Sequence, residues 1–172
     1  MFLNYLKDFI VKKTLKSSLK NLENNFSAVT IKKVGLLIDS TTFLETEELI
    51  NELIANGILE KNIKTIIYSD TIKKTEKSIH PIFNTGNLKW NGEILEKEIN
   101  DFINENFDLL ISFYDVEKAV LMQITHNSKA QFKVGFSSID LRLNHFIIKT
   151  TLDNHSLFVS ELFKYLKLLN KI

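Results

Sequence analysis

The stretch from Asp108 to Phe136 places the tightest constraint on the fold of this chain. It contains two short apolar runs, 108–113 and 131–136, and the first is typical of a strand that is buried on both faces. Between them, the apolar residues of 116–129 recur at helical spacing, which favours a packed crossover helix. Gly135 lies near the end of the second run, where a turn or a close approach is expected. The stretch therefore predicts a β-α-β unit with a right-handed connection.

The alternation of strand and helix extends over most of the chain. Further strands are expected at 33–39, 62–69 and 145–150. Further helices are expected from the hydroxyl residues Ser40, Thr41 and Thr42 to Asn56, with Gly57 as the stop, and over 93–106 and 154–170. This order predicts an α/β fold, a Rossmann-like three-layer sandwich with a mainly parallel sheet of about five strands.

The last two of these helices each show an apolar stripe that predicts core residues. In the helix over 93–106, the residues expected to be buried are Ile94, Leu95, Ile99, Phe102 and Ile103. In the closing helix, they are Leu157, Leu162, Phe163, Leu166 and Leu169.

Residues 1–23 are predicted to form an N-terminal amphipathic helical arm, and 24–172 a single α/β domain. The apolar stripe of the arm changes direction: Phe2, Leu6, Phe9 and Ile10 share one face, and Val11, Leu15, Leu19 and Leu22 share another. Either the helix breaks near residues 10–13 or its two halves meet different partners. Five lysines against one acid make residues 1–22 basic. The arm is expected to cover the sheet, to bind a protein partner or a second copy, or to lie on an anionic membrane.

Composition excludes several classes of protein. The 172 residues include no cysteine, which excludes disulfides, thiolate metal sites and a cysteine nucleophile. The formal net charge of +1 and the absence of interleaved basic and aromatic residues argue against nucleic acid as a partner. No apolar run approaches the roughly 20 residues of a membrane span, and the start lacks a basic signal region, so we expect a cytoplasmic protein.

Ligands of open α/β sheets bind at the carboxyl ends of the strands, where the strand order reverses. Hydroxyls and helix N-termini there suit an anion, and the only arginine suits a phosphate or carboxylate, so a small anionic metabolite is one predicted ligand. The same residue types also cap helices. The ligand-binding candidates are Asp39, Ser40, Thr41, Ser112, Tyr114, Ser137 and Arg142.

No stronger chemical motif supports this site. Gly35 and Gly135 stand alone, without a phosphate-binding loop. Asp39 and Asp115 can be imagined as a carboxylate pair, but nothing in the sequence fixes their distance. The four histidines have no metal-ligand spacing, and no GxSxG elbow marks a nucleophile. We therefore assign no catalytic or metal-binding residue and leave the cofactor open.

The segment 82–92 is the least regular part of the chain. Its turn signals surround Trp90, the only tryptophan. Trp90 is expected either to anchor this loop on the domain or to stack on a ligand.

A resemblance to a known family rests on several short motifs in a distinctive order. They are Trp90-Asn-Gly92, Phe107-Asp-Leu-Leu-Ile-Ser112-Phe-Tyr114, Ser128-Lys-Ala130, Phe132-Lys-Val-Gly135, Arg142-Leu-Asn144 and the ending Tyr165-Leu-Lys-Leu-Leu-Asn-Lys-Ile172. The chain resembles a family of small bacterial proteins catalogued as a domain of unknown function, which implies a fold and a bacterial origin but no reaction. The β-α-β unit is also similar to the N-terminal, acceptor-side half of heptosyltransferase-type glycosyltransferases, whose second half this chain is too short to contain.

Two functional hypotheses follow. The first is a non-enzymatic binding or protein-interaction module, with the N-terminal arm mediating self-association or attachment to a partner. The second is a small enzyme or sensor that binds a phosphorylated or nucleotide-like metabolite at the strand ends. An open polar crevice around Arg142 would favour the metabolite, and a filled one the interaction module.

Overall fold

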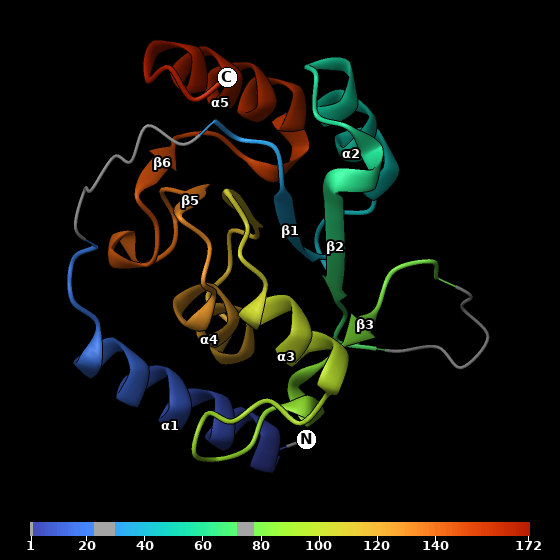
Figure 1. Ribbon diagram of the computed structural model, residues 1–172. Helices are drawn as coiled ribbons and strands as arrows, with labels where there is room; N and C mark the ends of the chain where they lie inside the picture. Colours follow the sequence, from blue (N-terminus) through green and yellow to red (C-terminus); the bar gives the residue numbers. More distant parts are fainter. Residues whose placement is uncertain (1, 23–29, 72–77) are drawn as a thin grey trace.

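The structure of the protein is a computed structural model, which describes residues 2–22, 30–71 and 78–172. In this part of the chain, one six-stranded sheet has the order β3-β2-β1-β4-β5-β6, and every neighbouring pair of strands is parallel (Figure 1). The strands are β1 (Val34–Asp39), β2 (Ile63–Tyr68), β3 (Ile82–Phe83), β4 (Leu109–Phe113), β5 (Phe132–Phe136) and β6 (Phe146–Ile148). The predicted α/β class and parallel sheet are confirmed.

Five α-helices of the described residues complete the layers. They are α1 (Phe2–Ser18), α2 (Thr46–Ala55), α3 (Lys97–Asn104), α4 (Ala119–Asn127) and α5 (His155–Leu168). Single 3₁₀ turns lie at Glu60–Asn62, Thr85–Asn87, Leu141–Leu143 and Leu152–Asn154. Helices α2 and α5 cover one face of the sheet, α3 and α4 cover the other, and α1 lies outside α4 (Figure 1).

The alternation of side chains along β1 divides the core between these layers. Val34, Leu36 and Ile38 belong to the apolar cluster under α2 and α5. Leu37 belongs to the cluster under α3 and α4. Because successive side chains of a strand point to opposite faces, Asp39 is directed to the same side as Leu37, towards α4.

Strand β3 was not predicted, because two residues are too few to show a periodicity. It forms in the segment expected to be irregular, where Pro81 and Phe83 accept backbone hydrogen bonds from Ile67 (2.9 Å) and Ser69 (2.9 Å). It makes the sixth strand and one edge of the sheet.

The predicted start of the second helix is wrong. Ser40, Thr41 and Thr42 form a turn, in which the Asp39 carboxylate accepts a hydrogen bond from the backbone N–H of Thr41 at 3.0 Å. The helix begins only at Thr46. A side chain that can cap a helix can equally stabilise a turn, so the hydroxyl signal did not fix the boundary. The predicted stop is confirmed, since Gly57 has a φ of +100°.

Three predicted core leucines are exposed. Leu95 precedes α3, which starts at Lys97, so it does not share the stripe of that helix. Leu157 lies on the outward side of α5, and Leu169 lies just beyond its last residue. The other predicted core residues of these two helices are buried, namely Ile94, Ile99, Phe102, Ile103, Leu162, Phe163 and Leu166.

Helix α1 is continuous through residues 10–13, so the predicted alternative of a break there is wrong. Val11, Leu15 and Leu19 are buried, and α1 packs against α4. The helix ends at Ser18, short of the predicted residue 23. The predicted boundary between arm and domain, at residues 23 and 24, lies outside the described residues.

Candidate functional site

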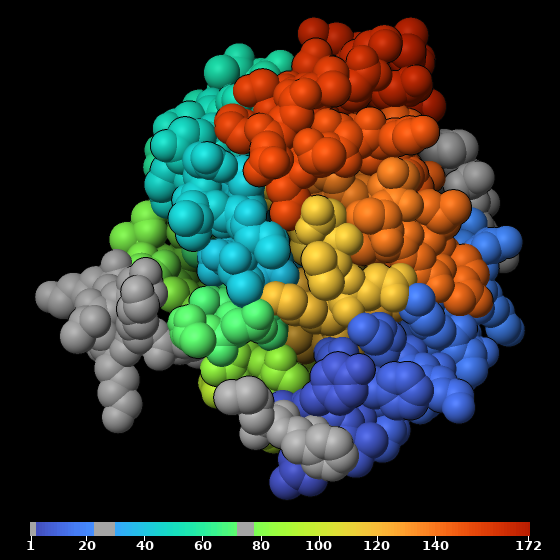
Figure 2. All heavy atoms as spheres, turned by 180° about the vertical axis from the view of Figure 1, so that it is seen from behind, coloured from blue at the N-terminus to red at the C-terminus, as the bar shows by residue number. Residues whose placement is uncertain are grey.

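The strand order reverses between β1 and β4, and this reversal defines where a ligand of such a sheet is expected. Three polar or charged residues converge beside it. Asp39 is the last residue of β1, Tyr68 is the last residue of β2, and Lys118 directly precedes α4. In the space-filling view from behind, the segment that contains Lys118 (gold) meets the segment after β1 (cyan), the segment after β5 (orange) and α1 (blue) (Figure 2).

Lys118 is the centre of this cluster. Its ammonium Nζ lies 2.8 Å from Asp39 Oδ2 and 3.3 Å from Asp70 Oδ2, and it donates a hydrogen bond to Thr41 Oγ1 at 3.2 Å. Nζ also lies 4.3 Å from the centre of the Tyr68 ring, within cation–π distance. Asp39 Oδ2 receives no well-aligned hydrogen bond within the described residues, so its contact with Lys118 is an ion pair.

The Tyr68 hydroxyl links the cluster to the loop after β3. It donates to Asp70 Oδ1 at 2.5 Å and lies 2.8 Å from Thr85 Oγ1. Burial, followed by the hydrogen bond to Asp70, raises the pKa of the Tyr68 hydroxyl, which therefore stays protonated at neutral pH. Burial opposes ionisation of Asp70, but the Tyr68 hydrogen bond and the Lys118 charge outweigh it and hold the pKa of Asp70 below its ordinary value.

Taken together, these contacts make a nearly self-satisfied network. Lys118 contacts three oxygen atoms and an aromatic face, and its side chain is only 17% exposed. The cluster contains two carboxylates against one ammonium, so it does not present a free positive charge to an anion. Its evident role is to tie the ends of β1 and β2 to the start of α4.

The seven predicted site residues are only partly brought together. Asp39 and Thr41 belong to the Lys118 cluster, and the Ser40 hydroxyl donates to the Tyr68 carbonyl at 2.8 Å. Ser112 and Tyr114 are fully buried and point to α4, where both hydroxyls lie within 3.0 Å of Thr125 Oγ1.

The remaining two candidates follow β5. Ser137 is exposed, and its backbone N–H donates to Ile148. Arg142 donates to Asp140 through Nε at 2.9 Å and Nη2 at 2.7 Å, and its Nη1 donates to the carbonyl of Leu19 at 3.2 Å. Arg142, which was predicted to bind an anion, is therefore already neutralised by Asp140. Its guanidinium instead holds the chain just beyond α1 in place.

Sequence reasoning missed Lys118 and Lys133. Lys133 of β5 is buried below α4, and its ammonium donates to the carbonyls of Thr125 at 2.7 Å and His126 at 3.0 Å. A lysine within an otherwise apolar strand was the available signal for Lys133. The signal for Lys118 was indirect: Asp39 ends β1 and Asp70 follows the adjacent parallel strand β2 by two residues, and two converging carboxylates favour a cation between them.

Helix α1 is fastened to the domain by its polar side chains. Lys7 is buried and donates to the carbonyl of Thr85 at 2.9 Å. Asp8 Oδ1 accepts a hydrogen bond from the backbone N–H of Ala119 at 2.7 Å, so it satisfies the N-terminus of α4. Lys12 pairs with Asp8 at 3.4 Å and donates to the carbonyl of Glu117 at 2.7 Å.

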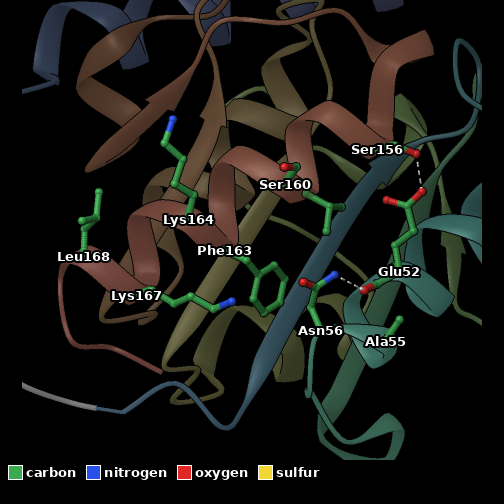
Figure 3. Close-up of a pocket in the computed structure, with 10 residues that line it drawn as sticks. Glu52, Ala55, Asn56, Ser156, Ser160, Phe163, Lys164, Lys167 and Leu168 are labelled. Atoms are coloured by element: carbon green, nitrogen blue, oxygen red, sulfur yellow. Dashed lines mark hydrogen bonds between the residues drawn. The ribbon is translucent and has the colours of Figure 1, made fainter.

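A groove of about 730 Å³ runs between α2 and α5 (Figure 3). It lies on the opposite side of the sheet from the Lys118 cluster. Ala55 and Phe163 give it an apolar floor, and Lys167 reaches across its face. At its far end, the Glu52 carboxylate accepts a hydrogen bond from the Ser156 hydroxyl at 2.5 Å and lies 3.1 Å from His155 Nδ1. A serine, a histidine and a glutamate thus meet here, but both partners bind the carboxylate, so the serine is not activated by the histidine.

The described residues contain neither a cluster of metal ligands nor a helix that could span a membrane. Within 2–22, 30–71 and 78–172, no three histidine or acidic side chains lie close enough together to hold a metal ion. In the same part of the chain, no helix is both long and apolar enough to cross a membrane.

The fold and the strand-end cluster define a parallel α/β domain with a Rossmann-type strand order. The chain belongs to the family described as "Family of unknown function (DUF6913)", whose profile matches residues 7–169. This finding confirms the predicted kinship with a domain of unknown function. No curated protein and no solved structure matched the chain, so the predicted likeness to heptosyltransferase-type enzymes receives no support.

Proposed function

We propose that this protein is an interaction module that self-associates through the outward face of the N-terminal half of α1. One observation carries the proposal. Leu3, Tyr5, Phe9 and Ile10 are 40–74% exposed, although the opposite side of the same helix is packed on α4. Contiguous exposed apolar patches on soluble proteins commonly mark interaction sites. This surface is called the α1 outer face below.

Charge decides which partner suits this surface. Lys7 and Asp8 are the only charged side chains among the first ten residues, and both bind the domain itself. An anionic membrane would require several uncommitted cations beside the apolar residues. Lys12 and Lys16 are engaged, by Asp8 and Glu117, which leaves the exposed Lys13 as the free cation next to Phe9 and Ile10 among the described residues. The four residues of the α1 outer face are therefore apolar and uncharged, and the exposed Lys13 lies one turn beyond them.

A neutral apolar face is complementary to a second copy of itself. In a two-fold dimer the same surface of each subunit forms the interface, so any charged residue near the axis faces its own copy. Unpaired charges of the same sign would therefore repel one another there. Tyr5 and Phe9 are four residues apart, as are Leu6 and Ile10, and this is a spacing with which paired helices interdigitate. The proposed dimer pairs the two α1 helices and buries Tyr5 and Phe9 between them.

The test is the oligomeric state of the full chain. The double variant Tyr5→Ser/Phe9→Ser should shift sedimentation equilibrium of a dimer towards the monomer, with an unchanged fold by circular dichroism. The matched control is Leu59→Ser/Leu95→Ser, which removes two exposed apolar side chains from elsewhere and should leave the dimer intact. A wild type that stays monomeric up to its highest soluble concentration would overturn the proposal.

The metabolite hypothesis concerns the strand ends. Its strongest residue, Arg142, is bound to Asp140, and Lys118 spans the crevice at the strand reversal. By the criterion of an open or a filled crevice, these contacts support the interaction module. A ligand at the strand ends stays a prediction.

A further inference from the structure

A second cavity lies away from both the Lys118 cluster and the α1 outer face. It has a volume of about 200 Å³, is open to solvent on one side, and is lined by the C-terminal half of α1, the turn at 90–92 and the end of α4. Since a water molecule takes up about 30 Å³ of liquid, the space corresponds to roughly six or seven waters. That size suits one ring with its substituents and not a dinucleotide or a peptide.

Its lining is uncharged. One quarter of all residues in the chain are charged, yet no lysine, arginine, aspartate or glutamate of the described residues lines this cavity. Burial, followed by the nearby charge of Lys133, lowers the pKa of His126, so the imidazole in the lining is neutral at pH 7. A charged ligand would leave water without gaining an opposite charge here.

Trp90 is presented to this cavity by a tight hairpin. Leu88 and Ile94 form an antiparallel bridge, and the backbone N–H of Lys89 donates to Glu93 at 2.8 Å. Gly92 turns the chain with a φ of +84°, and a Cβ added to it would lie 3.4 Å from the Gln123 side chain. Trp90 itself is 50% exposed at the tip, so it is held in place by the hairpin and not by burial of its ring.

Amide side chains supply the polar partners. Gln123 and Asn127 of α4 line the cavity, and within the described residues neither amide forms a hydrogen bond. Each amide carries two N–H donors and a carbonyl acceptor. The Ser18 hydroxyl donates to the carbonyl of Leu15 at 2.8 Å, which leaves its oxygen free to accept.

We infer that this cavity binds a small uncharged ring compound, with one apolar face against Trp90 and a polar edge against Gln123 and Asn127. An indole offers a broad apolar surface that stacks on flat or ring-shaped partners. A side-chain amide can donate and accept at once, as it does towards the edge of a base. Nucleosides and monosaccharides share this combination of apolar face and polar edge, and the experiment distinguishes between them.

The test uses calorimetric titration of the full chain with adenosine, uridine, glucose and N-acetylglucosamine. Trp90 is the only tryptophan, so its fluorescence reports binding at this cavity directly. We expect saturable binding of a nucleoside or of a sugar, weakened roughly tenfold in Gln123→Ala through the loss of its hydrogen bonds. Trp90→Ala should abolish binding, and Trp90→Phe should retain part of it.

The control variant is Asn104→Ala, which removes an exposed amide at the end of α3 and should bind like the wild type. Each variant is first compared with the wild type by thermal unfolding, so that a lost fold is not mistaken for a lost site. The inference is overturned if none of the four compounds binds. It is equally overturned if Gln123→Ala and Trp90→Ala bind as tightly as the wild type, or if AMP and glucose 6-phosphate bind more tightly than their uncharged counterparts.

Discussion

Two lysines at opposite ends of α4 show how differently the same side chain is accommodated in this fold. Lys118 precedes the helix and contacts two carboxylates, Asp39 at 2.8 Å and Asp70 at 3.3 Å. Lys133 lies under the last turn and is 4% exposed, and its ammonium contacts two backbone carbonyls. In the described part of the chain, no carboxylate lies within 4 Å of the Lys133 ammonium.

The two environments have opposite energetic consequences. The Lys118 ammonium neutralises the Asp39 carboxylate, which is wholly buried. Removing either partner would leave a buried charge unpaired and strongly lower the free energy of unfolding. Lys133 instead satisfies the carbonyls at the C-terminus of α4, a favourable place for a cation, but burial lowers its pKa to about 8. One lysine is a partner for buried charge, and the other is a buried charge held by dipoles.

The largest effect is expected when the compensated site loses its cation. Lys118→Met keeps most of the aliphatic stem over Tyr68 but leaves the buried Asp39 carboxylate unpaired. Breaking a buried pair in this way costs about 3 kcal/mol or more, so the free energy of unfolding should fall by about that amount. Urea unfolding followed by circular dichroism measures it.

The same site offers an internal control. Asp39→Asn/Lys118→Met removes both charges, so it should be less destabilised than the sum of the two single variants. Additive effects would show that Asp39 and Lys118 do not interact in the folded protein.

The sequence was sufficient to predict the layers of this fold but not the contacts of either lysine. The apolar runs that became β1, β4 and β5 are buried along their whole length, so composition alone marked them as central parallel strands. Lys118 itself carries no local signal, because a lysine before a helix has the same sequence pattern whether it faces water or a buried aspartate. Its partners come from residues 39 and 70, and only the tertiary fold brings them together.

The candidate site was harder to predict for a related reason. Asp39 and Thr41 were placed correctly at a strand end, yet Ser112 and Tyr114 turned inwards to Thr125. Successive side chains of a strand point to opposite faces of the sheet. An error of one residue in the predicted position of a strand therefore places a side chain on the wrong face. Arg142 was chosen because it is the only arginine of the sequence. That choice did not take account of Asp140, two residues earlier, which pairs with it.

The second prediction concerns the uncompensated lysine and is a dependence on pH. The folded-state pKa of Lys133, about 8, lies below the ordinary 10.5, so between these values the unfolded chain binds more protons. Stability contributed by this group therefore rises with pH from about 8 to 10.5. Lys133→Met removes that rise, so the stability difference should move in favour of the wild type by on the order of 1–3 kcal/mol between neutral pH and pH 10.

Comparing wild type and variant at each pH cancels the other titrating groups. Urea unfolding at several pH values in this range gives the difference directly. A difference that stays constant, or that moves in favour of the methionine variant, would show that the Lys133 ammonium is better solvated than its burial indicates.

A smaller effect is expected from the hydroxyl that supports the Lys118 cluster. Tyr68→Phe removes the hydrogen bonds to Asp70 and Thr85 but keeps the ring beneath the ammonium. A net loss of about 1 kcal/mol should appear in urea unfolding. Because Asp70 loses its tyrosine partner, the pKa of its carboxyl should also rise towards its ordinary value, which NMR titration of the side chain measures.

The smallest effect separates the two carboxylates that share Lys118. Asp70 is 51% exposed, so Asp70→Asn should cost less than about 1 kcal/mol, well below the effect of Lys118→Met. The folded-state pKa of Asp70 is lowered, so its contribution is complete above the ordinary value of 3.8 and disappears as the pH falls through the folded-state value. Wild type and Asp70→Asn should therefore converge in stability at acid pH. If Asp70→Asn were instead as damaging as Asp39→Asn, the exposed acid would be as important to Lys118 as the buried one, and burial would not explain the difference between them.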